Sequence, residues 1–173
     1  MFRPRNLKKS IIMGTIKNTL AGLAGAVALN VLHESLKHLH NTPRIDLLGE
    51  EALQEGLEQM GIDKIKDKDT LYGATLGGDI LSNAAYYSLI GAGQPEHYWA
   101  RAITLGVVAG VGAVVLPEKM GLHDQPVARN NTVKALTVGY YVVGALVTAA
   151  VLSAGRDKPS EKIDRLVRRY GLE

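Results

Sequence analysis

The chain has 173 residues, no cysteine and a formal net charge of +3. The lack of cysteine excludes disulfides, thiolate metal ligands and a cysteine nucleophile, and no stripe of basic residues interleaved with aromatic ones points to nucleic acid. Hydrophobic residues make up 46% of the chain and are gathered into four blocks, with the charges between and outside them. This pattern predicts an all-α integral membrane protein, a four-helix bundle in which residues 1–173 form a single transmembrane domain.

The first apolar block covers residues 11–32 and follows a basic N-terminal segment. At about 1.5 Å per residue the block is roughly 33 Å long, enough to cross a hydrocarbon core of about 30 Å. A signal peptide is the alternative, because the segment also has Ala-x-Ala at 24–26 and 26–28. The length of the block and the charge of Lys17 within it favour a permanent membrane helix.

A polar insert, residues 34–70, separates the first block from the second. The first helix is expected to run into this insert and to stop before Pro43, because proline disfavours helix in the residue ahead of it. An amphipathic helix is predicted over 47–60, with Asp46 as its N-cap. Its polar face is acidic, so we expect it to pack over the protein's own helix ends rather than on anionic lipid.

Three further membrane helices are predicted, over 71–93, 99–116 and 133–153. Pro117 is expected to end the second of these, and 117–132 to form a polar loop. The tail, 155–173, is rich in Lys and Arg. It predicts a basic amphipathic helix on the cytoplasmic membrane surface.

The distribution of Lys and Arg predicts the orientation of the chain. These residues are more numerous on the side of the two termini than on the side of the polar insert. The positive-inside rule therefore places both termini in the cytoplasm. The expected location is the bacterial inner (plasma) membrane, with the lipid bilayer as the main partner and the acidic insert facing outward.

Small residues recur every four positions in three of the blocks. Such pairs are Gly73 with Gly77, Gly106 with Gly110, and Gly22 with Ala26. Rows of this kind let helix backbones approach closely. They predict either packing within the chain or contact with a second copy in a homo-oligomer.

A polar face runs along the second predicted membrane helix. Its members recur at intervals of three or four residues: Tyr72, Thr75, Asp79, Asn83 and Tyr86. Polar residues also occur near the end of the first helix that the insert joins to the second. We therefore predict a polar pocket between the two helices, formed by Asn30, His33, Glu34, Asp79, Asn83 and Tyr86. An ionisable residue inside a membrane is a functional-site hypothesis by default, and a hydrogen-bonded cluster that only fixes helix register is the alternative.

The histidines suggest a metal site. His33-Glu34-x-x-x-His38 misses the zincin spacing by one residue, but Glu34 and His38 are four residues apart and share a helical face. With His123 from the predicted outer loop, His33, Glu34 and His38 are candidate ligands for a divalent metal such as zinc. Ordinary interfacial histidines are the alternative.

The sequence contains no catalytic signature and no phosphate-binding loop. The leading hypothesis is therefore binding or transport of a proton, an ion or a small solute through the polar pocket. A membrane-embedded, metal-dependent enzyme that acts on a lipid-like substrate at the outer interface is the second hypothesis. A structural or interaction subunit is the third.

Overall fold

The computed structural model describes residues 4–155, and every regular element in this range is helical. The elements are α1 (Pro4–Leu36), α2 (Ile45–Gln59), α3 (Lys68–Ser88), η1 (Leu89–Gly91), η2 (Pro95–His97), α4 (Tyr98–Lys119), α5 (Gln125–Ala128) and α6 (Asn131–Ala154). Three stretches are long and apolar enough to cross a membrane: Met13–Leu36, Pro95–Lys119 and Asn131–Ala154. The predicted all-α class is confirmed for the described residues. The second predicted span, now α3, is not among the three.

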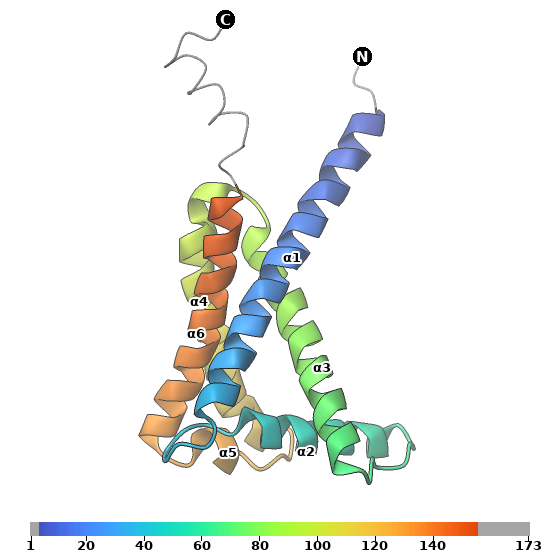
Figure 1. Cartoon of the computed structure of the whole chain (residues 1–173), viewed down its shortest axis with the longest axis vertical. Coiled ribbons are helices and arrows are strands. Elements are labelled where there is room, and N and C mark those ends of the chain that lie inside the picture. Colours follow the sequence, from blue (N-terminus) through green and yellow to red (C-terminus); the bar gives the residue numbers. More distant parts are fainter. Residues whose placement is uncertain (1–3, 156–173) are drawn as a thin grey trace, which may run out of the picture.

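The long helices follow one another in the order α4, α6, α1 and α3, which makes an open arc. α2 and α5 lie across the end at which α3 diverges from the other helices (Figure 1). α6 packs against α4 on one side and α1 on the other, and α1 also packs against α3. α3 and α4 form the two ends of the arc and scarcely contact each other. The start of α1 and the end of α6 lie at the end of the molecule away from α2 and α5 (Figure 1).

Small residues allow α1 and α4 to approach α6 closely. A Cβ added at Gly25 of α1 would collide with the Gly144 carbonyl and the Thr148 hydroxyl of α6. One added at Gly110 of α4 would lie 2.5 Å from the Cα of Val138. The small residues of the first and third predicted spans are therefore used for packing within the chain.

The Gly73–Gly77 pair of α3 has a different environment. Both glycines are exposed, and a Cβ added at either would have no heavy atom within 4 Å. This pair is not used for packing within the described part of the chain. A homo-oligomer formed through it stays a prediction.

The prediction that Asp46 caps the amphipathic helix is wrong. α2 begins two residues earlier than predicted, at Ile45, and Arg44 occupies the cap position without a side-chain hydrogen bond. Asp46 therefore lies within the first turn, and its carboxylate binds the Arg44 guanidinium, with Nη2 2.7 Å from Oδ2, in a charge-assisted pair. Elsewhere side chains do cap helices: Asp67 accepts a hydrogen bond from the Thr70 backbone N–H at the start of α3.

The prediction that Pro117 ends the third apolar helix is also wrong. α4 continues to Lys119 with Pro117 inside it, and its end is followed by Gly121 at φ +80°. So close to the end of a helix, the hydrogen bond that proline removes and the kink that its ring causes disturb only the last turn. The segment 117–132 is accordingly not a plain loop, because it contains the last turn of α4 and all of α5.

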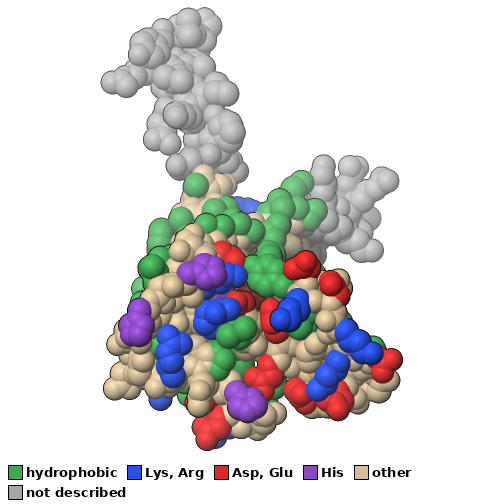
Figure 2. Space-filling model, turned by 60° about the horizontal axis from the view of Figure 1, so that its bottom comes forward, with side chains coloured by type: hydrophobic (Ala, Val, Ile, Leu, Met, Phe, Trp, Pro, Cys, Tyr) green, Lys and Arg blue, Asp and Glu red, His purple; other side chains and the backbone are tan. Residues whose placement is uncertain are grey.

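Charged side chains gather on the face formed by α2, α5 and the adjoining helix ends (Figure 2). Large apolar side chains are exposed along the long helices instead, among them Leu20 of α1, Val108 of α4 and Val143 of α6. An exposed apolar surface of this extent is typical of a face that meets lipid. Apart from Gly155, the predicted basic helix in the tail lies outside the described residues.

Candidate functional site

A cavity of about 600 Å³ lies in the gap of the arc, between α1, α3 and α4. α2 closes the cavity at the charged end of the molecule, where Ile45 and Leu48 line it. At the other end Tyr86 of α3 reaches α4, and its hydroxyl donates a hydrogen bond to the Leu105 carbonyl oxygen at 3.0 Å. The volume lies within the range of about 300–1,000 Å³ that small-molecule sites occupy.

The mouth of the cavity is the gap between α3 and α4. Ser82 on α3 and Val108, Leu116 and Met120 on α4 line the cavity and are exposed, as is Ala52 of α2. Between α2 and the Tyr86 bridge, the cavity opens toward the side of the bundle.

α2 is fixed against α3 at the floor of the cavity. Gly49 of α2 approaches Thr75 of α3 so closely that an added Cβ would lie 2.7 Å from the Thr75 Cγ2. The Gln54 side chain bonds both the N–H and the carbonyl of Ile65, at 3.0 and 2.8 Å, just ahead of α3. The first contact fixes α2 against α3, and the second fixes the segment 59–68 that joins the two helices.

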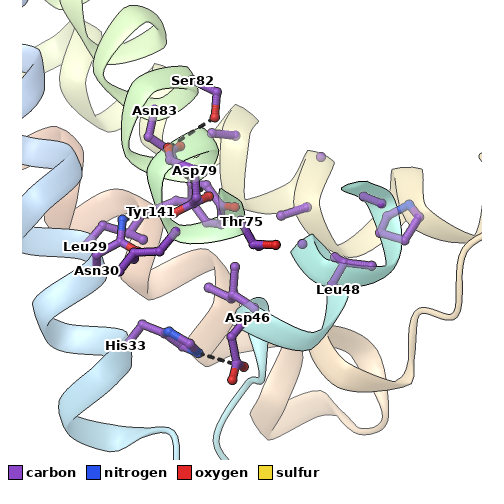
Figure 3. Close-up of a pocket in the computed structure, with 18 of the residues that line it drawn as sticks. Leu29, Asn30, His33, Asp46, Leu48, Thr75, Asp79, Ser82, Asn83 and Tyr141 are labelled. Carbon is purple, nitrogen blue, oxygen red and sulfur yellow. Dashed lines mark hydrogen bonds and ion pairs between the residues drawn. The ribbon is translucent and has the colours of Figure 1, made fainter. Parts of the chain in front are cut away.

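The inner wall of the cavity carries an anchored carboxylate. Asn30 of α1 and Asn83 of α3 flank Asp79, and each side-chain amide donates to one of its oxygens at 2.9 Å (Figure 3). Asn30 also donates to the Ala26 carbonyl at 3.0 Å, which fixes its amide group. Two neutral donors therefore orient the Asp79 carboxylate without neutralising it.

A network of ion pairs lies between this wall and the charged face. The Asp46 carboxylate is close to two cations and an imidazole, with Arg44 Nη2 at 2.7 Å, Lys37 Nζ at 3.7 Å and His33 Nε2 at 3.5 Å. Lys37 also binds Glu34 at 2.7 Å, and the Glu34 carboxylate is 3.4 Å from His33 Nδ1. The basic groups at this end of the cavity are thus engaged by Glu34 and Asp46.

The environment of Asp46 lowers the pKa of its carboxyl. Burial by itself favours the neutral acid and acts to raise this pKa, since the side chain is only 8% exposed. The neighbouring His33 and Arg44 side chains outweigh burial and hold the pKa well below the usual range. Asp46 therefore carries a negative charge at neutral pH and ties α2 to the end of α1.

Two buried polar atoms of the cavity wall have no hydrogen-bond partner among the described residues. They are the Thr75 hydroxyl and the His33 Nε2, whose 3.5 Å contact with Asp46 lacks hydrogen-bond geometry. Thr75 is 9% exposed and His33 3% exposed. Buried polar groups are normally satisfied, so each of these atoms is left with an unused hydrogen-bonding position.

All six residues predicted to form the polar pocket line this one cavity: Asn30, His33, Glu34, Asp79, Asn83 and Tyr86. The polar face of α3 does point toward α1. The interior of the site nevertheless differs from a wholly polar pocket, because most of the other residues that line it are apolar.

Sequence reasoning missed the far wall and the floor. α4 contributes a wall of small and aliphatic residues, including Gly112 and Ala113, and α6 contributes Tyr141. These residues give no signal in a search for polar spacing. Asp46 was detectable as a charge beside the amphipathic helix, but its contact with His33 depends on how the insert folds back.

The predicted metal ligands are not brought together. His33 and Glu34 belong to the ion-pair network, whereas His38 is exposed in the turn after α1. His123 lies after α4, where its Nδ1 is 2.6 Å from Glu51 of α2. Residues 4–155 contain no group of three or more His, Asp or Glu side chains arranged to hold a metal ion.

No known protein family, curated protein or solved structure matches this chain. The function is therefore argued from the geometry and chemistry of the site.

Proposed function

We propose that α3 crosses the membrane together with α1, α4 and α6, so that the chain is an integral membrane four-helix bundle. α3 has 21 residues, a length of about 32 Å at about 1.5 Å per residue. Lys68 and Asp69 in its first turn are exposed and charged, and the exposed residues from Gly73 onward are uncharged: Gly73, Ala74, Gly77, Gly78, Leu81, Ser82 and Ala85. Asp79, which lowers the mean hydropathy of the helix, faces the interior. The surface that α3 offers to lipid is therefore more apolar than its composition suggests.

Four crossings agree with the arrangement of the chain ends, since the start of α1 and the end of α6 lie at the same end of the bundle. The basic residues of the two terminal segments favour the cytoplasm for that end. The charged face over α2 and α5, together with the floor of the cavity, then lies on the outer side.

The protein binds a small amphipathic molecule in the cavity between α3 and α4. The observation that carries this proposal is the combination of a sideways opening, a mainly apolar lining and hydrogen-bonding groups that come mostly from α1 and α3. An apolar ligand body can enter from the lipid chains, and the polar end then reaches Asp79 and its neighbours. Sites that hold small molecules commonly combine apolar walls with a few placed polar groups.

Binding suits this geometry better than conduction of a proton or ion along the bundle. Toward the chain ends, α1, α3 and α6 interlock around Tyr87, which is fully buried and donates a hydrogen bond to the Tyr141 carbonyl at 2.9 Å. The polar groups therefore lie in a recess with one opening. A transport role requires a second conformation in which this closed end separates.

Filling the cavity tests the proposal. Gly112 lines the cavity, and a Cβ added there meets only the Leu116 side chain, at 3.6 Å. Gly112→Phe is therefore expected to keep the fold and to abolish binding of both decylamine and decanol, measured by NMR titration of the protein in maltoside micelles. The matched control is Gly139→Phe, because Gly139 of α6 does not line the cavity and has open space around it. Equal binding to wild type and Gly112→Phe would contradict the proposal.

A further inference from the structure

Asp79 differs from the other acidic residues of the cavity wall. Glu34 and Asp46 are paired with Lys37, Arg44 and His33, whereas no ion pair to Asp79 exists within residues 4–155. A carboxylate can accept about four hydrogen bonds, and the two amides supply two of them. Because a buried charge is costly unless it is paired, a ligand with a positive group would stabilise the ionised form of Asp79.

Thr75 supplies a second and independent observation. Thr75 lines the same cavity, and its buried hydroxyl has no hydrogen-bond partner in the part of the chain that the structure describes. Thr75 precedes Asp79 by four residues, so both side chains lie on one face of α3 (Figure 3). This face therefore offers several free acceptor positions next to a carboxyl group that has no ion-pair partner among the described side chains.

We propose that the amphipathic ligand carries an ammonium head group, which pairs with Asp79 and donates a hydrogen bond to Thr75. An ammonium group has three donors, no acceptor and one positive charge. It therefore complements the free acceptor positions of Asp79 and Thr75. The alkyl part of the ligand lies along Leu48, Leu76 and Leu116, which line the apolar part of the cavity. This inference rests on the proposed function of the cavity, since it names the chemical class of the molecule bound there.

The head group can be tested with probes that share one alkyl chain. Decylamine, decanol and decanoic acid are titrated at neutral pH against the protein in maltoside micelles, whose head groups are uncharged. Decylamine is expected to bind about tenfold to hundredfold more tightly than decanol, as for a hydrogen bond to a charged group. Asp79→Asn should remove this preference and leave decanol affinity unchanged. Asp69→Asn, the same change at an exposed position of α3, should retain it.

Thr75→Val keeps the proposal testable if Asp79→Asn does not fold. Valine has nearly the same shape as threonine and lacks the unpartnered hydroxyl. We expect a severalfold loss of decylamine affinity, unchanged decanol affinity and a Tm equal to or above that of the wild type, because a buried polar group without a partner is removed. An unchanged decylamine affinity would contradict the role given to Thr75.

The remaining outcomes separate this inference from the proposed function. If decanol or decanoic acid binds wild type as tightly as decylamine, or if the amine preference survives Asp79→Asn, the ammonium assignment is wrong although the cavity binds ligand. If no probe binds wild type, the proposed function fails, and the inference fails with it. Titration with a short-chain phosphatidylethanolamine then tells a lipid amine from a free alkylamine, and Asp79-dependent binding of either supports the assignment.

Discussion

Asp46→Ala should lower the free energy of unfolding by about 2–3 kcal/mol. The substitution leaves Arg44, Lys37 and His33 together without their shared carboxylate. Removing one partner of a fully buried ion pair costs roughly 3–5 kcal/mol. The expected loss is smaller than for a fully buried pair because the Arg44 side chain is 33% exposed and can turn toward water.

The measurement is equilibrium unfolding in mixed maltoside–dodecyl sulfate micelles. Asp63→Ala serves as the control, because Asp63 is an exposed carboxylate after α2 and its loss should change stability little. Equal stabilities of the Asp46→Ala and Asp63→Ala variants would show that the network at the floor of the cavity does not hold α2 in place.

The pH dependence of stability should identify the same carboxylate. The pKa of Asp46 is lowered in the folded protein, so the folded state favours the charged form. Its stabilising contribution is fully present above the unfolded pKa of about 3.9 and is lost as the pH falls through the lower folded value. The difference in stability between wild type and Asp46→Ala should therefore be constant from pH 7 to about pH 5 and shrink below about pH 4. A difference that already disappears near neutral pH would assign the effect to another group.

Gly25→Ala is expected to lower the free energy of unfolding by about 1–3 kcal/mol through overpacking. The added methyl group would collide with the Gly144 carbonyl and the Thr148 hydroxyl, and the first of these is backbone that cannot move aside without shifting α6. α1 and α6 would then have to separate along their contact. The loss should appear as a lower Tm in maltoside.

Two glycines with open surroundings are matched controls for this change. Added Cβ atoms at Gly14 of α1 and Gly73 of α3 would meet nothing within 4 Å. Alanine at these positions should leave the Tm unchanged or raise it, since alanine is the better helix former by about 1 kcal/mol. If Gly25→Ala behaves like these controls, the α1–α6 contact is looser than described.

Much of the fold is predictable because the length of each apolar block and the positions of its glycines can be read from the sequence without knowing how the helices pack. The four long helices were expected, and their bounds shift by up to seven residues, at the start of α1. Pro117 shows the limit of local rules: it can stand near the end of α4 because the distortion it causes there affects only the last turn. Asp46 shows another, since its partner is decided by Arg44 and by the return of the insert toward His33.

The polar half of the site is predictable for a similar reason. Residues that are three or four positions apart on a helix share a face, so the spacing of Thr75, Asp79 and Asn83 indicates one wall. Which helix stands opposite is decided by long-range packing. The apolar wall from α4 and the lateral opening follow from the order of the helices in the arc, which no sequence spacing encodes. The predicted metal set failed to assemble because His123 pairs with Glu51 instead.

Intermolecular NOEs to a bound amphiphile test the central claim most directly. Methyl-labelled protein in deuterated maltoside micelles is mixed with protonated decylamine, and NOEs from the alkyl chain are compared between cavity and outer methyl groups. A ligand in the cavity should give strong NOEs to Leu48 and Leu76, which line it, and these should vanish in Gly112→Phe. Val151, exposed on the outer surface of α6, should give only the weak NOEs of free amphiphile. NOEs of equal strength at Val151 and Leu48, or none at Leu48, would contradict a ligand site between α3 and α4.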